Sequence, residues 1–109
     1  MAANSADANE RADIRRLTSD ASKVRLTRTA EYDLLAHHLT KDDICDEVIA
    51  WIDSGARIKK VILRGQHAGQ AAFEMKPRIN NMLFYIKVAV CDRGDPAEYL
   101  LIVSAQPDH

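Results

Sequence analysis

Apolar residues recur at helical spacing in the first half of the chain and predict helices there. Ile14, Leu17 and Ala21 repeat at the intervals expected for one side of a short helix that starts near Asn9. Residues 24–26 form a short extended piece after it. A second helical pattern follows this extended piece.

Two threonines occupy positions typical of helix N-caps. Thr27 precedes a helix that ends near His37 and His38, and Thr40 precedes the most regular helical pattern of the chain. A threonine hydroxyl accepts a backbone N–H of the first turn, and the two aspartates that follow Thr40 suit the positive end of the helix dipole. Gly55 ends this helix because a residue without a Cβ readily adopts the left-handed conformation. Its apolar side comprises Ile44, Val48, Ile49 and Ile52, with Trp51 and Cys45 beside them.

Beyond this helix the apolar period changes to two, which is typical of strands. Residues 57–64 and 70–76 flank a turn bounded by glycines and predict a hairpin, and residues 82–91 and 98–105 predict a third and a fourth strand. We therefore expect an α+β fold in which two or three N-terminal helices pack on one face of a four-stranded antiparallel sheet.

The chain has the length of one domain. Its 109 residues with 47% hydrophobic content supply one core. Residues 1–8 lack a large apolar residue other than Met1 and predict a disordered tail, so residues 9–109 form the expected single α+β domain. Neither a secretory signal nor an apolar stretch of membrane-spanning length occurs, which predicts a cytoplasmic protein without a membrane partner. Cys45 and Cys91 have no partner at metal spacing and fit buried thiols in a reducing compartment.

The third strand has two chemically different faces. Tyr85 and Lys87 project from one face, and the apolar residues Met82, Phe84, Ile86, Val88 and Val90 face the helices. The same alternation in the second strand leaves Gln70, Glu74 and Lys76 outward. If the two strands are neighbours, these side chains form one polar cluster, which Lys60 and Arg64 join from the first strand.

This polar cluster has the composition of a phosphodiester site. The chain has 15 Lys and Arg against 16 Asp and Glu, so any site for a polyanion must be a local patch. Lysine and arginine neutralise phosphate, while a glutamate or a tyrosine can move a proton when a ribose 2′-hydroxyl attacks the adjacent phosphate. Alternating polar residues are equally typical of the solvated face of a half-buried sheet, so the pattern alone leaves both interpretations open.

Four short stretches of the chain carry a resemblance to a known family. They are Lys59-Lys60-Val61, Phe73-Glu74-Met75-Lys76-Pro77-Arg78 shortly after Gln70, Leu83-Phe84-Tyr85-Ile86-Lys87-Val88 and Leu101-Ile102-Val103-Ser104. Together with the order of elements from Val24 to Ser104, they resemble the MqsR-type toxins of bacterial toxin–antitoxin systems, which have a RelE-like ribonuclease fold.

The resemblance implies an endoribonuclease that cleaves messenger RNA without a metal or other cofactor and is neutralised by a cognate antitoxin protein. The family's lysine ahead of the first strand is matched by Lys60 or Lys59, its glutamine by Gln70 and its tyrosine by Tyr85, with Lys87 following. The leading hypothesis assigns catalysis to Lys60, Gln70, Glu74, Tyr85, Lys87 and His109, and RNA binding to Arg64, Lys76 and Arg78.

The end of the chain departs from the family pattern. The family's last strand ends in Ser-Phe-Lys with a functional lysine, whereas Ser104 is followed here by Ala-Gln-Pro-Asp-His. Gln106 or His109 lies near the place of that lysine. His109 is a candidate proton donor because an imidazole titrates near neutral pH.

Two other kinds of protein stay open beside the ribonuclease. One is a non-catalytic protein-interaction module with the same fold. The other is a self-associating domain, a homodimer, because residues 100–103 are apolar on both faces and their strand must be central in the sheet or covered by a partner. A metal site is not expected, since His37, His38 and His67 lack ligand spacing and fit surface or interface positions.

Overall fold

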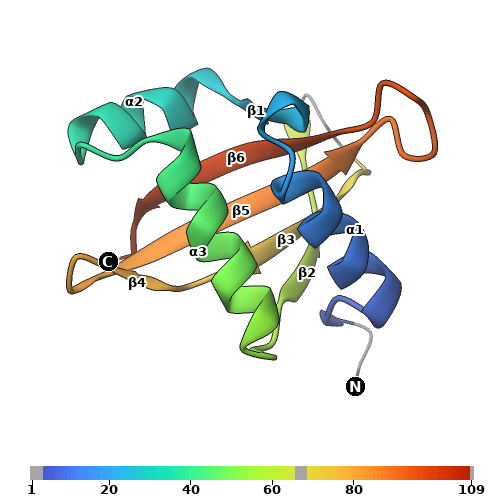
Figure 1. Cartoon of the computed structure of the whole chain (residues 1–109), viewed down its shortest axis with the longest axis horizontal. Helices are drawn as coiled ribbons and strands as arrows, with labels where there is room; N and C mark the ends of the chain where they lie inside the picture. Colours follow the sequence, from blue (N-terminus) through green and yellow to red (C-terminus); the bar gives the residue numbers. More distant parts are fainter. Residues whose placement is uncertain (1–3, 66–68, 109) are drawn as a thin grey trace.

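The computed structural model describes residues 4–65 and 69–108. Over these residues the protein is α+β, with three α-helices and a six-stranded, mostly antiparallel sheet (Figure 1). The helices are α1 (Ala8–Thr18), α2 (Arg28–Ala36) and α3 (Lys41–Asp53), with a 3-10 turn η2 (Ala21–Lys23). The strands are β1 (Val24–Leu26), β2 (Lys59–Ile62), β3 (Ala71–Met75), β4 (Arg78–Ile79), β5 (Met82–Cys91) and β6 (Tyr99–Pro107).

The sheet has six strands in the described part of the chain, and the expectation of four was wrong. Its order is β1-β6-β5-β3-β2, with β4 paired to β5. The two additional strands, β1 and β4, have three and two residues, too few to show alternation in the sequence. β1 also pairs in parallel with β6 across a long sequence separation, with Val24 opposite Leu100.

The second and third helices begin and end where the sequence predicts, whereas the first ends at Thr18, before Ala21, which lies in the 3-10 turn. The Thr27 hydroxyl accepts the backbone N–H of Ala30 at 3.1 Å, and the Thr40 hydroxyl accepts that of Asp43 at 3.1 Å. Gly55, just beyond α3, has a φ of 79°, in the left-handed region. Local capping chemistry therefore sets both predicted helix starts.

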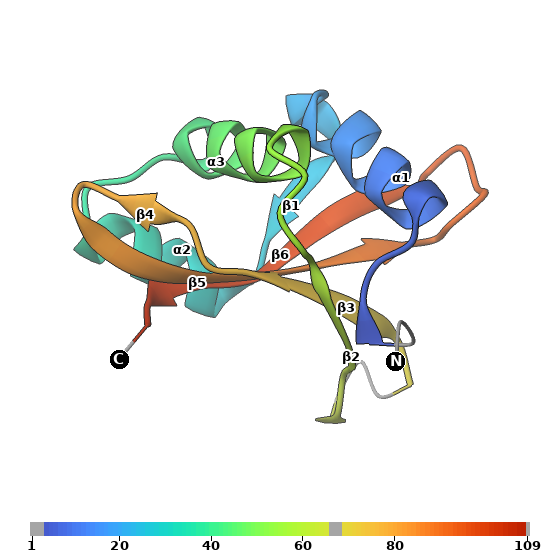
Figure 2. The same cartoon turned by 90° about the horizontal axis from the view of Figure 1, so that it is seen from below.

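Two helices cover one face of the sheet. α1 and α3 lie side by side on this face, and α2 lies beside β6 at the edge of the sheet (Figures 1 and 2). The apolar side of α3 packs on the inward residues of β3, β5 and β6. The largest fully buried side chains are Ile14, Leu17, Ile44, Val48, Ile58, Met75, Ile86, Val88, Leu100 and Ile102.

Two peripheral predictions differ from the structure. Ser5 forms a β-bridge with Lys59, and the Ala6 N–H donates to the Ile58 carbonyl at 2.9 Å, so part of the expected tail contacts the start of β2. Met82 was expected to face the helices, but 45% of it is exposed because it lies at the very start of β5.

The strand β6 is interior to the sheet, between β1 and β5. Its apolar run over residues 100–103 is therefore covered within the chain. None of the helices over residues 4–65 and 69–108 has the length and apolar character needed to cross a membrane.

Candidate functional site

The face of the sheet opposite α1 and α3, called the open face below, carries a row of polar side chains. The strand register places Ser104 of β6 opposite Lys87 of β5, Lys87 opposite Glu74 of β3, and Glu74 opposite Lys59 of β2. Residues that face each other across neighbouring strands share one face of a sheet. One carboxylate therefore lies between two lysines in the middle of the open face.

Tyr85 completes this arrangement. Its hydroxyl donates a hydrogen bond to Oε2 of Glu74, and Nζ of Lys87 lies 3.7 Å from the same oxygen. The Lys87 ammonium also lies 5.6 Å from the centre of the Tyr85 ring. We call Lys59, Glu74, Tyr85 and Lys87 the Glu74 cluster; it contains two cations, a carboxylate and a phenol.

Glu74 and Lys87 of the cluster are half-buried, and burial affects the protonation of Tyr85. The side chains of Glu74 and Lys87 are 15% and 23% exposed. Burial raises the pKa of Tyr85 above its ordinary value, and its hydrogen bond to Glu74 and the negative charge of that residue raise it further. Tyr85 therefore stays protonated at neutral pH and serves as a hydrogen-bond donor to Glu74.

The prediction that Lys60 joins this cluster was wrong. Lys60 lies opposite Phe73, which faces the helices, and its Nζ forms an ion pair of 2.6 Å with Oε2 of Glu10 in α1. Of the two lysines that the family resemblance left open, the open face carries Lys59. The sequence was ambiguous here because two adjacent lysines precede three adjacent apolar residues, so no alternation fixes the register, and a shift of one position turns every side chain of a strand to the other face.

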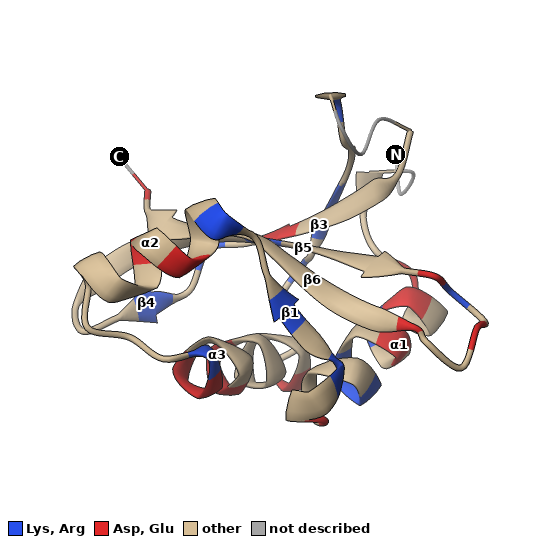
Figure 3. Ribbon diagram, turned by 90° about the horizontal axis from the view of Figure 1, so that it is seen from above, with Lys and Arg blue, Asp and Glu red and all other residues tan. Residues whose placement is uncertain are grey.

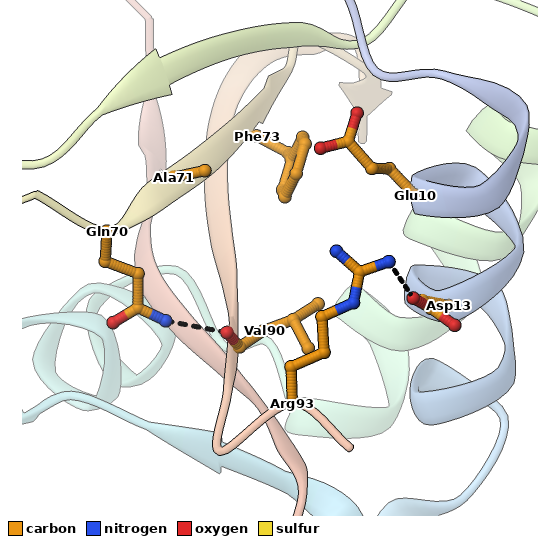
Figure 4. A pocket seen from close by; sticks show the side chains of 7 residues that line it. All are labelled: Glu10, Asp13, Gln70, Ala71, Phe73, Val90 and Arg93. Atoms are coloured by element: carbon orange, nitrogen blue, oxygen red, sulfur yellow. Dashed lines mark hydrogen bonds and ion pairs between the residues drawn. The ribbon is translucent and has the colours of Figure 1, made fainter.

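Gln70 lies apart from the Glu74 cluster. Its Nε2 donates to the Val90 carbonyl at 2.6 Å and lies 3.4 Å from Sγ of Cys91. Gln70 also lines a pocket between α1 and the sheet, in which it points toward Val90 across from Glu10 (Figure 4). Gln70 precedes β3 and lies four positions from Glu74, about 13 Å along an extended chain, so the amide holds two strands together outside the Glu74 cluster.

The predicted RNA-binding residues are spread over three places. Lys76 follows β3 on the side of Glu74, and its Nζ lies 3.3 Å from Oδ2 of Asp108. Arg64 is exposed beyond the far end of β2, and Arg78 is exposed on β4. His109 lies outside the described residues, as does His67.

Two residues near the cluster were missed as site residues. Trp51 of α3 and Arg57 of the α3–β2 loop line one pocket with Lys59, Glu74 and Lys76. Sequence reasoning predicts Trp51 at the edge of the core, and its packing against the core confirms this. The pocket was not foreseeable, because it depends on how the end of α3 meets the start of β2.

The open face also has an apolar half next to the Glu74 cluster. Ala72, Ala89, Cys91 and Leu101 are buried there, with Val61, Leu63, Tyr99 and Val103 packed around them. Arg25 lies over the Tyr99 ring, 4.2 Å from its centre. The boundary between the polar and the apolar half of the open face therefore crosses β3 between Glu74 and Ala72.

Negative charge is concentrated on α3. This helix has five acidic residues and one lysine, and Asp42 and Asp43 lie in its first turn (Figure 3). The chain as a whole has a net charge of −1. The net charge of the chain is therefore nearly zero although cations gather locally around Glu74. These cations are Arg57, Lys59, Lys76 and Lys87.

The remaining nucleophilic and ligating groups lie elsewhere. Cys45 and Cys91 are free and buried, as predicted, and burial raises the pKa of the Cys45 thiol to about 11. In the described ranges, no three His, Cys, Asp or Glu side chains come together in a way that would hold a metal ion.

Comparisons of the chain with protein-family models, with curated proteins and with solved structures found no match.

Proposed function

We propose that the protein is a metal-independent endoribonuclease that binds RNA on the open face and cleaves it at the Glu74 cluster. The observation that carries the proposal is the position of Glu74, a half-buried carboxylate with Lys59 and Lys87 on either side and a hydrogen bond from Tyr85. A carboxylate surrounded by cations can take a proton from a hydroxyl group while the cations stabilise the charge that develops on a phosphate.

In the proposed reaction Glu74 removes the proton from a ribose 2′-hydroxyl. The 2′-oxygen forms a bond to the adjacent phosphorus, and the bond from phosphorus to the 5′-oxygen of the next nucleotide breaks. The ammonium group of Lys87 gives a proton to that leaving oxygen. The products are a 2′,3′-cyclic phosphate and a free 5′-hydroxyl, so atoms and charge balance without a metal or a cofactor.

Tyr85 serves in this proposal as a positioning residue. The raised pKa of Tyr85 means that its hydroxyl does not readily release a proton, so we do not assign it as the general acid. Instead, its hydrogen bond orients Glu74 toward the substrate. Lys59 and Lys76 neutralise the phosphates on either side of the scissile bond. Arg64 and Arg78 lie farther away and would reach only more distant phosphates.

The resemblance to MqsR-type toxins supports the same class. Tyr85 and Lys87 of the resembling stretch lie next to Glu74, and Lys59 lies opposite it. Gln106, near the place of the family's terminal lysine, lies opposite Tyr85. We extend the proposal to a RelE-like fold, a cytoplasmic location and a cognate antitoxin that neutralises the enzyme.

The direct test incubates the purified protein with messenger RNA in EDTA. We expect cleavage by the unmodified protein and a loss of about 100-fold or more for Glu74→Gln, since a positioned general base contributes at least that much. Lys87→Ala and Tyr85→Phe should also cleave more slowly. Arg28→Ala, an exposed cation at the start of α2, is the matched control and should cleave normally. Equal background cleavage by all the proteins would reject the ribonuclease.

The alternative function is a non-catalytic interaction module. It is favoured by exposed apolar side chains, since 60% of Ile62 on the edge strand β2 and 72% of Leu35 on α2 are accessible. A stable complex with the product of an adjacent gene, together with absent RNA binding and absent toxicity on expression, would select this function over the enzyme.

A further inference from the structure

The pocket beside the Glu74 cluster combines an aromatic ring with several cations. Its volume is about 280 Å³, and it is lined by Trp51, Arg57, Lys59, Glu74 and Lys76. Pockets for drug-sized ligands usually hold about 300 to 1,000 Å³. This pocket is therefore suited to a group the size of one nucleotide unit.

The Trp51 ring is held in a fixed orientation. Its Nε1 donates to the Arg57 carbonyl at 3.1 Å, and the side chain packs against the apolar core while staying partly exposed. The ring is packed on the core and its only polar atom is hydrogen-bonded, so it is already ordered in the free protein. A ligand can therefore stack on its accessible surface with little further loss of side-chain entropy.

The cations around the ring lie where a nucleic acid backbone would pass. Arg57 and Lys59 are exposed at the start of β2, and Lys76 lies just beyond the end of β3. The Arg57 guanidinium is steadied by Ser5, whose Oγ accepts from Nε at 2.6 Å. Aromatic rings for bases and cations for phosphates are together the usual means by which proteins hold single-stranded nucleic acid.

The pocket adjoins the proposed cleavage site. Glu74 belongs to both, because it lines the pocket and accepts the hydrogen bond from Tyr85. A nucleotide seated in the pocket would therefore lie beside the phosphate that is cleaved at the Glu74 cluster.

We propose that this pocket is a nucleobase subsite, in which an unpaired base of single-stranded RNA stacks on Trp51 next to the scissile phosphate. The inference rests on the proposed ribonuclease function and names its substrate: RNA that is single-stranded at the cut. Paired bases are excluded, because a base within a duplex is stacked on its neighbours and cannot enter the pocket.

Tryptophan fluorescence tests the subsite directly, because Trp51 is the single tryptophan of the chain. The probe is a short 2′-O-methylated oligonucleotide, which lacks the nucleophilic hydroxyl and cannot be cleaved. We expect it to quench the Trp51 fluorescence. An abasic oligomer with the same number of phosphates should bind more weakly and leave the fluorescence nearly unchanged.

Variants measure the contribution of the ring. Trp51→Leu should weaken binding of the methylated oligonucleotide by about 5- to 150-fold, as expected for one stacked base. Trp51→Phe keeps a ring and should retain most of the affinity. Tyr32→Leu removes an aromatic residue of α2 that is 66% exposed and should bind normally. Circular dichroism checks that each variant folds, and the comparison of base-bearing with abasic oligomers in the unmodified protein stands without any variant.

The outcomes separate the subsite from the ribonuclease. Quenching that requires bases, without cleavage of ordinary RNA, would support the subsite and reject the enzyme. Cleavage with equal quenching by base-bearing and abasic oligomers would reject the subsite alone. If neither oligomer binds, both the subsite and the ribonuclease are rejected.

Discussion

At the scale of single residues, the contact with Glu74 affects how Tyr85 titrates. Burial, the hydrogen bond to Glu74 and the charge of that residue all raise the pKa of Tyr85, since each opposes the phenolate. Glu74→Gln removes the negative charge and should lower the pKa of Tyr85 toward the ordinary tyrosine value of about 10. Tyrosine absorbance measured against pH, with Tyr85→Phe subtracted, checks this. An unchanged titration in Glu74→Gln would show that burial acts alone.

The same contact affects stability at high pH. A group whose pKa is raised by folding contributes stability that is complete below its unfolded pKa and is lost as pH rises through the folded value. The unmodified protein should therefore lose stability above about pH 10, where unfolded tyrosine ionises. Tyr85→Phe should lose less stability over the same pH interval, in urea unfolding experiments.

The two neighbouring lysines of β2 should affect different properties when each is replaced: one RNA binding, the other stability. Lys59→Ala should weaken RNA binding by several-fold and leave stability nearly unchanged, because its side chain is exposed on the open face beside Glu74. Lys60→Ala should bind RNA normally but lose about 1–2 kcal/mol of stability, because the buried Glu10 is left without its cation. Fluorescence anisotropy and urea unfolding measure the two quantities. Equal effects of both substitutions would contradict the register of β2.

At the scale of whole elements, side chains of α1 hold this helix against the end of α3. Arg11 donates to the Ala56 carbonyl at 2.7 Å and to the Ile52 carbonyl at 2.9 Å, which joins α1 to the last turn of α3 and to the loop that follows it. Arg15 forms an exposed ion pair with Asp53 at 2.7 Å. The two arginines are one helical turn apart but bind partners of different kinds.

This difference predicts unequal losses of stability. Arg11→Ala should lower the free energy of unfolding by about 2 kcal/mol, because two charged hydrogen bonds to part-buried carbonyls disappear. Arg15→Ala should cost clearly less, because solvent screens an exposed pair. Thermal and urea unfolding of the two variants compare them directly. A larger loss for Arg15→Ala would mean that α1 is held mainly by its outer surface.

Sequence patterns predicted the helices well because their signals are local. Thr27, Thr40 and Gly55 lie within one turn of the helix ends that they set. The alternation of β5 likewise predicted that Tyr85 and Lys87 face away from the helices. The parallel pairing of β1 with β6 was not predicted, since it joins short segments far apart in sequence and leaves no periodic pattern.

The same reasoning explains which part of the site was foreseen. Glu74, Tyr85 and Lys87 lie on long strands with a clear twofold pattern, so the sequence predicted that they meet. The short strand β2 has no clear alternation of polar and apolar residues. Lys60 was therefore predicted on the open face, whereas the structure has Lys59 there. Trp51 reaches the site through helix-to-sheet packing, which no local pattern encodes.

At the scale of the whole molecule, the distribution of charge matters more than its sum. The net charge of −1 would not attract RNA, yet four cations, Arg57, Lys59, Lys76 and Lys87, lie around Glu74, with Asp108 paired to Lys76. α3 carries acidic residues on the opposite side of the sheet. The molecule should therefore bind RNA in one orientation, with the acidic start of α3 turned away.

This arrangement predicts a specific dependence of binding on salt. Three or four phosphates neutralised by the cations around Glu74 should give a slope of about −2 to −3 for the logarithm of the binding constant against that of the salt concentration. Removing two of the cations with Lys59→Ala and Lys87→Ala should reduce the magnitude of the slope by about 1.4. Asp46→Asn, on the exposed side of α3, is the control and should leave the slope unchanged. A slope near zero, or the same slope in the double variant, would show that RNA does not bind on the open face.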